Sequence, residues 1–338
     1  MAVVHRWWTL GAVALAMAGC GGGGGDSGSS GVVVPTGVRS GTASAGADVT
    51  QANATGFVGV MARSVLGAAD GNVPVLSSER ESPQARLAGT AATPGLLRFA
   101  ADTAARRLAT AAAREQAQAI TTGPLPCVTG TGSLTVNDAD NNLRVSRGDS
   151  FSFVFTNCVL EVGLPPLTGT LAFTVNAVEL DAQEEPTALD ATITLTGFAE
   201  AGFGSMSGSF RVWYKDESTT STRQRISYLD TTVVEQGQNL VYSFDVYGVA
   251  GTIGGSFDLN GALTVGGQAY AMSSTQFTHG AGTLPATGAV TLRDAAGDAV
   301  IVRARSTTTF DLEFQAAGAA APTVVSAGLL WSAYRLGN

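Results

Sequence analysis

SFSFVFT, residues 150–156, places Phe151, Phe153 and Phe155 on one side of an extended chain and small or polar residues, with one valine, on the other. This period of two is typical of a β-strand with one buried face. The alternation returns at 171–175 and 193–195 and in further runs from 206 to 314, separated by short, glycine-rich loops. It predicts roughly ten to thirteen antiparallel strands.

The chain before this region has a different period. Phe57, Met61 and Val65 are spaced by four residues, which predicts an amphipathic helix near 51–69. A second helix is expected near 94–120, where Pro94 suits the first helical position. The expected fold is therefore mainly β: a large antiparallel sheet, as an open or closed barrel or a sandwich, with one or two N-terminal helices. We expect a signal peptide at 1–19, a lipidated cysteine with a flexible Gly/Ser linker at 20–50, a helical segment at 51–125 and the antiparallel β-domain at 126–338.

Residues 1–20 read MAVVHRWWTLGAVALAMAGC, with a positive start at Arg6, an apolar run at 10–17 and two small residues before Cys20. This stretch resembles the lipobox of bacterial lipoproteins, although Met17 stands where leucine is usual. The resemblance implies that Cys20 is lipidated and carries fatty acids such as palmitate. Glycine after the cysteine implies delivery to the outer membrane, at its periplasmic or its surface face. An ordinary signal peptide or an uncleaved anchor is the alternative, but the apolar run is short for a membrane span.

Charge and composition limit the partners. The net charge is −8, Lys215 is the only lysine, and the arginines form no basic run. Nucleic acid is therefore not an expected partner, because its binding requires a positive patch. Few charges and many small polar residues are typical of an exported, periplasmic or extracellular β-protein.

Cys127 and Cys158 are the two cysteines that remain after Cys20. An exported chain meets oxidising conditions, so we predict a single disulfide between them with a structural role.

Catalytic signatures are scarce. His5 leaves with the signal peptide, and His279 lies in the glycine-rich stretch FTHGAG, where we expect a solvated loop residue. One imidazole does not build the usual histidine metal site, and no G-x-S-x-G nucleophile motif is present. Asp311 and Glu313 share one strand face, which we interpret as the solvent side. We expect no enzyme activity and no cofactor.

One acidic segment has calcium-ligand spacing. Asp138, Asp140, Asn142 and Asp149 fall at positions 1, 3, 5 and 12 of an EF-hand-like count. Against a metal, Leu143 stands at position 6, where such a loop needs glycine, and no helices flank it. The sequence favours a polar hairpin turn between strands near 131–137 and 143–156, with no metal and with calcium as the alternative.

The stretch PATGAVTLRDAAGDAVIVRARSTTTFDLEFQAAG, followed by LLWSAY, resembles the closing hairpins of uncharacterised β-rich lipoproteins from Proteobacteria. GDSFSFVFTNC, residues 148–158, resembles the same group. The resemblance covers roughly the β-domain and implies no functional residues.

These observations favour an envelope lipoprotein, held at the membrane through its lipid anchor, with a noncatalytic structural or binding role. One alternative is a carrier of lipid or another hydrophobic ligand in a barrel cavity. The other is a hydrolase of envelope polymers, which would need a carboxylate pair or His279 in a cleft. Strand aromatics such as Trp213 and Tyr247 are interpreted as packing residues rather than as the lining of a carbohydrate or lipid cleft. A transmembrane barrel ranks lower, because the chain ends in LGN without a terminal aromatic.

Overall fold

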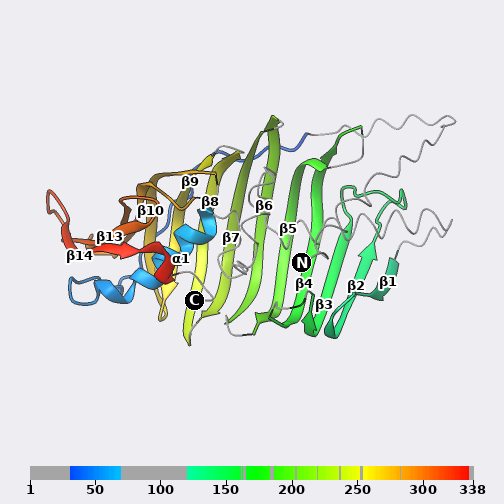
Figure 1. Ribbon diagram of the computed structural model, residues 1–338, viewed down its shortest axis with the longest axis horizontal. Helices are drawn as coiled ribbons and strands as arrows, with labels where there is room; N and C mark the ends of the chain where they lie inside the picture. Colours follow the sequence, from blue (N-terminus) through cyan, green and yellow to red (C-terminus); the bar gives the residue numbers. More distant parts are fainter. Residues whose placement is uncertain are drawn as a thin grey trace, which may run out of the picture. The chain divides into compact units, whose positions relative to one another are not determined.

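The structure, a computed structural model, describes residues 31–69, 120–160, 162, 165–182, 186–201, 204–218, 220–235, 237–251, 254–281 and 283–334. In these residues fourteen strands form one antiparallel sheet, and each strand pairs with its neighbours in the chain (Figure 1). Within the described part of the chain the sheet is open, since β1 pairs only with β2 and β14 only with β13. The mainly β prediction is confirmed, as an open sheet.

The elements follow one another in simple order. They are η2 (Ala54–Gly56), α1 (Val58–Ala69), β1 (Ile120–Pro124), β2 (Thr129–Asn137), β3 (Ser150–Val159), β4 (Leu167–Leu180), β5 (Pro186–Glu200), β6 (Gly204–Ser218), β7 (Ser221–Glu235), β8 (Gln238–Gly251), β9 (Gly254–Val265), β10 (Gln268–Gly280), β11 (Thr287–Arg293), β12 (Ala299–Ala304), β13 (Thr309–Gln315), β14 (Thr323–Leu330) and η3 (Trp331–Tyr334). The alternation missed only the two edge strands, β1 and β14. The sequence of β14, TVVSAGLL, has no clear period of two, and the exposure of its residues does not alternate either.

The sheet has two chemically different faces. Directly paired residues of antiparallel strands lie on the same face, and the register runs from Phe173 through Ile193 and Phe210 to Tyr228. All four are buried and belong to one hydrophobic core, so we call this side the apolar face. The opposite side, which carries Asp190, Trp213 and Arg225, is the polar face.

Helix α1 covers part of the apolar face. It contacts β9 and β12, and its apolar stripe of Val60, Met61 and Val65 is buried. Phe57, just before the helix, meets Tyr270 of β10 with the ring centroids 5.0 Å apart. The helix predicted near 51–69 is therefore confirmed over Val58–Ala69. The second predicted helix lies outside the described residues, apart from Ile120, which begins β1.

Residues 31–49 do not form the free linker expected for 20–50. They cross the polar face from β4 to β10 and are here called the N-terminal strap, the blue trace behind the sheet in Figure 1. The strap begins at the Glu179 carboxylate of β4, passes Arg225 of β7 and reaches Ala269 of β10. At its end, the Val49 amide donates to Asp294, and the chain then turns towards α1. Side-chain and backbone partners on the sheet thus replace the solvent that a linker would have.

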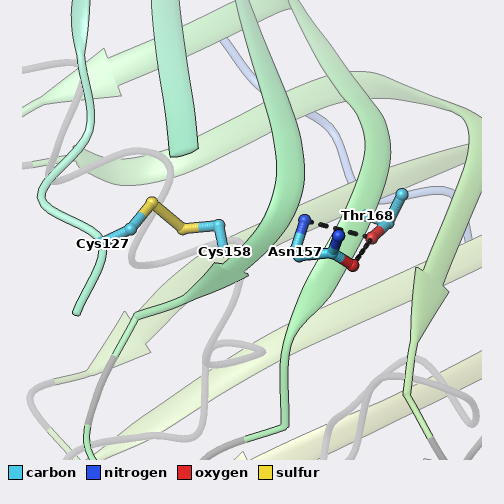
Figure 2. Close-up of a disulfide and its surroundings, with 4 residues drawn as sticks. All are labelled: Cys127, Asn157, Cys158 and Thr168. Atoms are coloured by element: carbon cyan, nitrogen blue, oxygen red, sulfur yellow. Dashed lines mark hydrogen bonds between the residues drawn. A yellow bond between two sulfur atoms is a disulfide. The ribbon is translucent and has the colours of Figure 1, made fainter. Parts of the chain in front are cut away.

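The predicted disulfide between Cys127 and Cys158 is present (Figure 2). Asn157, beside Cys158, adopts a left-handed φ of 49°, and the register of β3 shifts between Phe155 and Cys158. This bulge turns Cys158 onto the apolar face, where it is fully buried. Thr168 stabilises the bulge by accepting from the Asn157 amide at 3.3 Å. Closing a 31-residue separation stabilises the fold by about 3 to 4 kcal/mol in the chain-entropy model.

The signal peptide and Cys20 lie outside the described residues. No helix in the part of the chain that the structure describes combines the length and apolarity needed to cross a bilayer.

At Gly41 the strap lies close against the backbone of the sheet. A Cβ atom there would lie 1.6 Å from the backbone oxygen of Gly261, whereas one at Gly37 would meet nothing within 4 Å. Gly41→Ala should therefore lift the strap and lower the free energy of unfolding by about 1 to 3 kcal/mol. Urea unfolding, with Gly37→Ala as the matched control, measures this effect. Equal stabilities of the two variants would contradict this packing.

Candidate functional site

Ion pairs cross the polar face beside the strap. Arg211 of β6 binds Asp190 of β5 through Nε at 2.7 Å and Nη2 at 2.5 Å, and this hydrogen bonding raises the pKa of Arg211. Arg225 of β7 pairs with Asp245 of β8, and both side chains are buried. Trp213 lies between the two arginines, whose guanidinium carbons are 4.7 and 6.0 Å from its ring centroid. Arg211 and Arg225 therefore stabilise the pairing of neighbouring strands, and Arg225 also binds the strap.

A second ion-pair network joins β12 and β13. Arg303 contacts both oxygens of Glu313, at 2.9 and 3.1 Å from Nε, and Arg305 bridges Glu313 and Asp311. The two carboxylates lie on the polar face but are buried, so the expectation of a solvent-facing pair was wrong. Burial pushes the pKa of Asp311 up, but the Gly328 amide and the two arginines outweigh it and hold that pKa below its ordinary value. An acid–base pair needs one carboxyl with a raised pKa, and the pKa of Asp311 is lowered instead.

The calcium candidate is a loop between β2 and β3. Oxygens of Asp138, Asp140 and Asp149 all lie within 4.8 Å of one another, so three of the four candidate residues are brought together. Asp138 and Asp149 are buried and Asp140 is exposed. Asn142 contributes its backbone amide to Asp138 and Asp140, and its side-chain amide donates to Asp140.

Backbone amides already satisfy the buried carboxylates of this loop. Asp149 accepts from Ala139 at 2.9 Å and from Ser146 at 2.7 Å, and Asp138 accepts from Leu143 at 2.7 Å. Burial raises the pKa of Asp149, the amide bonds oppose it, and the nearby Asp138 charge adds to the rise. Leu143 itself adopts the left-handed conformation, with φ of 61°, that the sequence assigned to glycine. The geometry is that of a turn held by its own carboxylates.

Substitutions at two aspartates distinguish buried from exposed members of the loop. Asp149→Ala leaves two amides without their acceptor and should lower the free energy of unfolding by about 2 to 3 kcal/mol. Asp140→Ala removes only exposed contacts and should change it by about 0.5 kcal/mol. Chemical unfolding of both variants in chelator-treated buffer checks the difference. A larger loss from Asp140→Ala would contradict it.

Glu200 is a buried carboxyl that sequence analysis did not single out. It ends β5 on the apolar face, two residues after the buried Phe198, and Leu167 and Gly204 are its cross-strand partners. Among the described residues, its Oε1 atom has no hydrogen-bond partner. Burial in these surroundings raises its pKa to about 7. The only hint in the sequence is Gly197, which has a φ of 54° where the strand bulges and its inward positions shift by one.

Glu200 should make stability fall with rising pH. The folded-state pKa of about 7 exceeds the ordinary 4.5, so the protonated carboxyl favours folding below pH 4.5 and this advantage is lost as the pH rises through 7. The shift corresponds to about 3 kcal/mol. Glu200→Gln should remove this component of the pH dependence, while Glu217→Gln, at an exposed pair with Arg223, should keep it. Urea unfolding from pH 4 to 8 tests it; an unchanged slope in Glu200→Gln would overturn the assignment.

His279 is not a solvated loop residue as expected. It lies in β10, half-buried, with its ring centroid 6.2 Å from that of Phe257, and its Nδ1 is 3.1 Å from the Gly280 carbonyl. A groove of about 510 Å³ lies nearby at the ends of β7, β8 and β9, lined by residues such as Ser221, Val249 and Ser256. The described residues that line it supply hydroxyls and backbone groups.

Comparisons of this chain with protein-family models, with curated proteins and with solved structures find no match.

Proposed function

We propose that this protein is a lipid-anchored envelope lipoprotein of the outer membrane, with a noncatalytic structural or binding role. The observation that carries the proposal is the sequence of residues 1–20, in which a positive start, an apolar run and Ala18-Gly19 precede Cys20. The Cys127–Cys158 disulfide agrees with an oxidising compartment outside the cytoplasm.

The ion pairs support the noncatalytic part of this proposal. A hydrolase would use Asp311 with Glu313, but Arg303 and Arg305 hold both carboxylates in charged pairs. His279 donates to a neighbouring carbonyl and lies against an aromatic ring. Neither group has the pairing that general acid–base chemistry requires.

Filling of the apolar face disfavours the carrier alternative. Phe153, Phe210, Tyr228 and Phe244 project from that face and are fully buried. Tyr228 packs against Phe210 with ring centroids 5.6 Å apart and against Phe244 at 5.0 Å. A binding role therefore fits the polar face better, where Trp213 is only half-buried.

Metabolic labelling with a fatty-acid probe tests the anchor. The full chain expressed in a Gram-negative host should take up the label and sediment with the outer membrane. Cys20→Ser should lose the label and enter the soluble fraction, because the acylated thiol is gone. The double variant Cys127→Ser/Cys158→Ser is the matched control and should stay labelled. Label retained by Cys20→Ser, or absent from the unaltered chain, would refute the proposal.

A further inference from the structure

The strap begins at one particular end of the sheet. Strands β4, β6 and β8 finish at Leu180, Ser218 and Gly251, and we call this the Leu180 end. Strands β5, β7 and β9 finish at the opposite end, here named the Val265 end after the last residue of β9. Val32 is held by Glu179, one residue from the Leu180 end, whereas Val49 reaches Asp294 beyond the last residue of β11, at the Val265 end.

The start of the strap is fixed by a charged clamp. The Val32 amide donates to Glu179 Oε1 at 2.5 Å, and the Val32 carbonyl accepts from Lys215 Nζ at 3.4 Å. Lys215 and Glu179 form an ion pair at 3.0 Å, so both backbone groups of Val32 are bound to one pair. Val32 itself is buried.

Further hydrogen bonds fix the strap to the sheet beyond Val32. Arg225, already paired with Asp245, donates to the carbonyls of Pro35 at 3.1 Å and Gly37 at 2.7 Å. Arg39 donates to the backbone oxygen of Tyr228. Because these contacts succeed one another along the strap, a pull on the chain before Val32 acts at the Leu180 end and not further along the strap.

The chain between the lipid site and this clamp is short. Eleven residue steps separate Cys20 from Gly31. Fully extended they span at most about 40 Å, and a Gly-rich coil of that length averages about 20 Å. Ser221 and Val234, near opposite ends of β7, are thirteen residues apart and therefore about 43 Å apart along the strand.

We propose that the strap orients the anchored sheet, so that its Leu180 end faces the lipid bilayer and its Val265 end points away. This inference rests on the proposed lipid anchor and adds to it which surface lies against the membrane. The Leu180 end carries the exposed acidic residues Asp216 and Glu217, so electrostatic attraction to anionic headgroups is not the source of this orientation. The tether positions that end by its length alone.

Energy transfer to lipid acceptors tests the orientation. Thr220→Cys and Asn239→Cys place a single free thiol at the two ends of the β7–β8 hairpin, at exposed positions, since the other cysteines are lipidated or paired. The lipidated full chain, labelled with a donor dye, is reconstituted in phosphatidylethanolamine/phosphatidylglycerol vesicles that contain acceptor-labelled headgroups. Transfer from position 220 should exceed that from position 239 by about twofold or more, because about 40 Å separates the labels along the strands.

A longer tether is the matched control. Inserting thirty Gly/Ser residues between Ser30 and Gly31 raises the average span to about 35 Å and should reduce the difference between the labels. Equal transfer from both positions in the unaltered chain, or a difference that the insertion leaves unchanged, would overturn the inference. Flotation of the vesicles is read in parallel. Protein that floats and transfers equally refutes only the orientation, whereas protein that fails to float refutes the anchor and the orientation together.

Discussion

The register between antiparallel strands is the constraint on which the rest of the structure depends. Because side chains alternate between the faces of a strand, a slip of one residue would exchange the aromatic and the charged sets. Phe173, Ile193, Phe210 and Tyr228 stay in line across four strands, β4 to β7. On the reverse face Asp190, Trp213 and Arg225 stay in line across three of them, β5 to β7. Either set alone would favour this register, and the two sets reinforce each other.

Bulges adjust this register where the alternation has to change. The bulge at Asn157 turns Cys158 inward to its disulfide partner, and the one at Gly197 turns Glu200 inward to apolar surroundings. The first stabilises the fold through a covalent link, and the second places an ionisable carboxyl where its charge is costly. The same device therefore produces both a stabilising and a pH-sensitive feature.

On the polar face, charged residues pair with one another and also bind the strap. Arg225 and Asp245 form a buried pair that also binds strap carbonyls, so the charges of two strands hold a segment of chain from far away in the sequence. Leaving one partner of such a pair alone would cost more than the pair contributes, which makes the pairing specific. The charged side chains thus organise the path of the chain between the sheet and the proposed anchor.

The sequence by itself determined the β class, a helix near 51–69, the disulfide and the short spacing of Asp138, Asp140 and Asp149, because each depends on local periodicity, on compartment chemistry or on nearness in the chain. Only the tertiary structure decided that residues 31–49 bind the polar face, that Asp311 and Glu313 are buried, and that Glu200 and His279 point to the apolar face. The physical reason is that a period of two assigns a face only as far as the next bulge. Burial, moreover, depends on which distant segment lies over a residue.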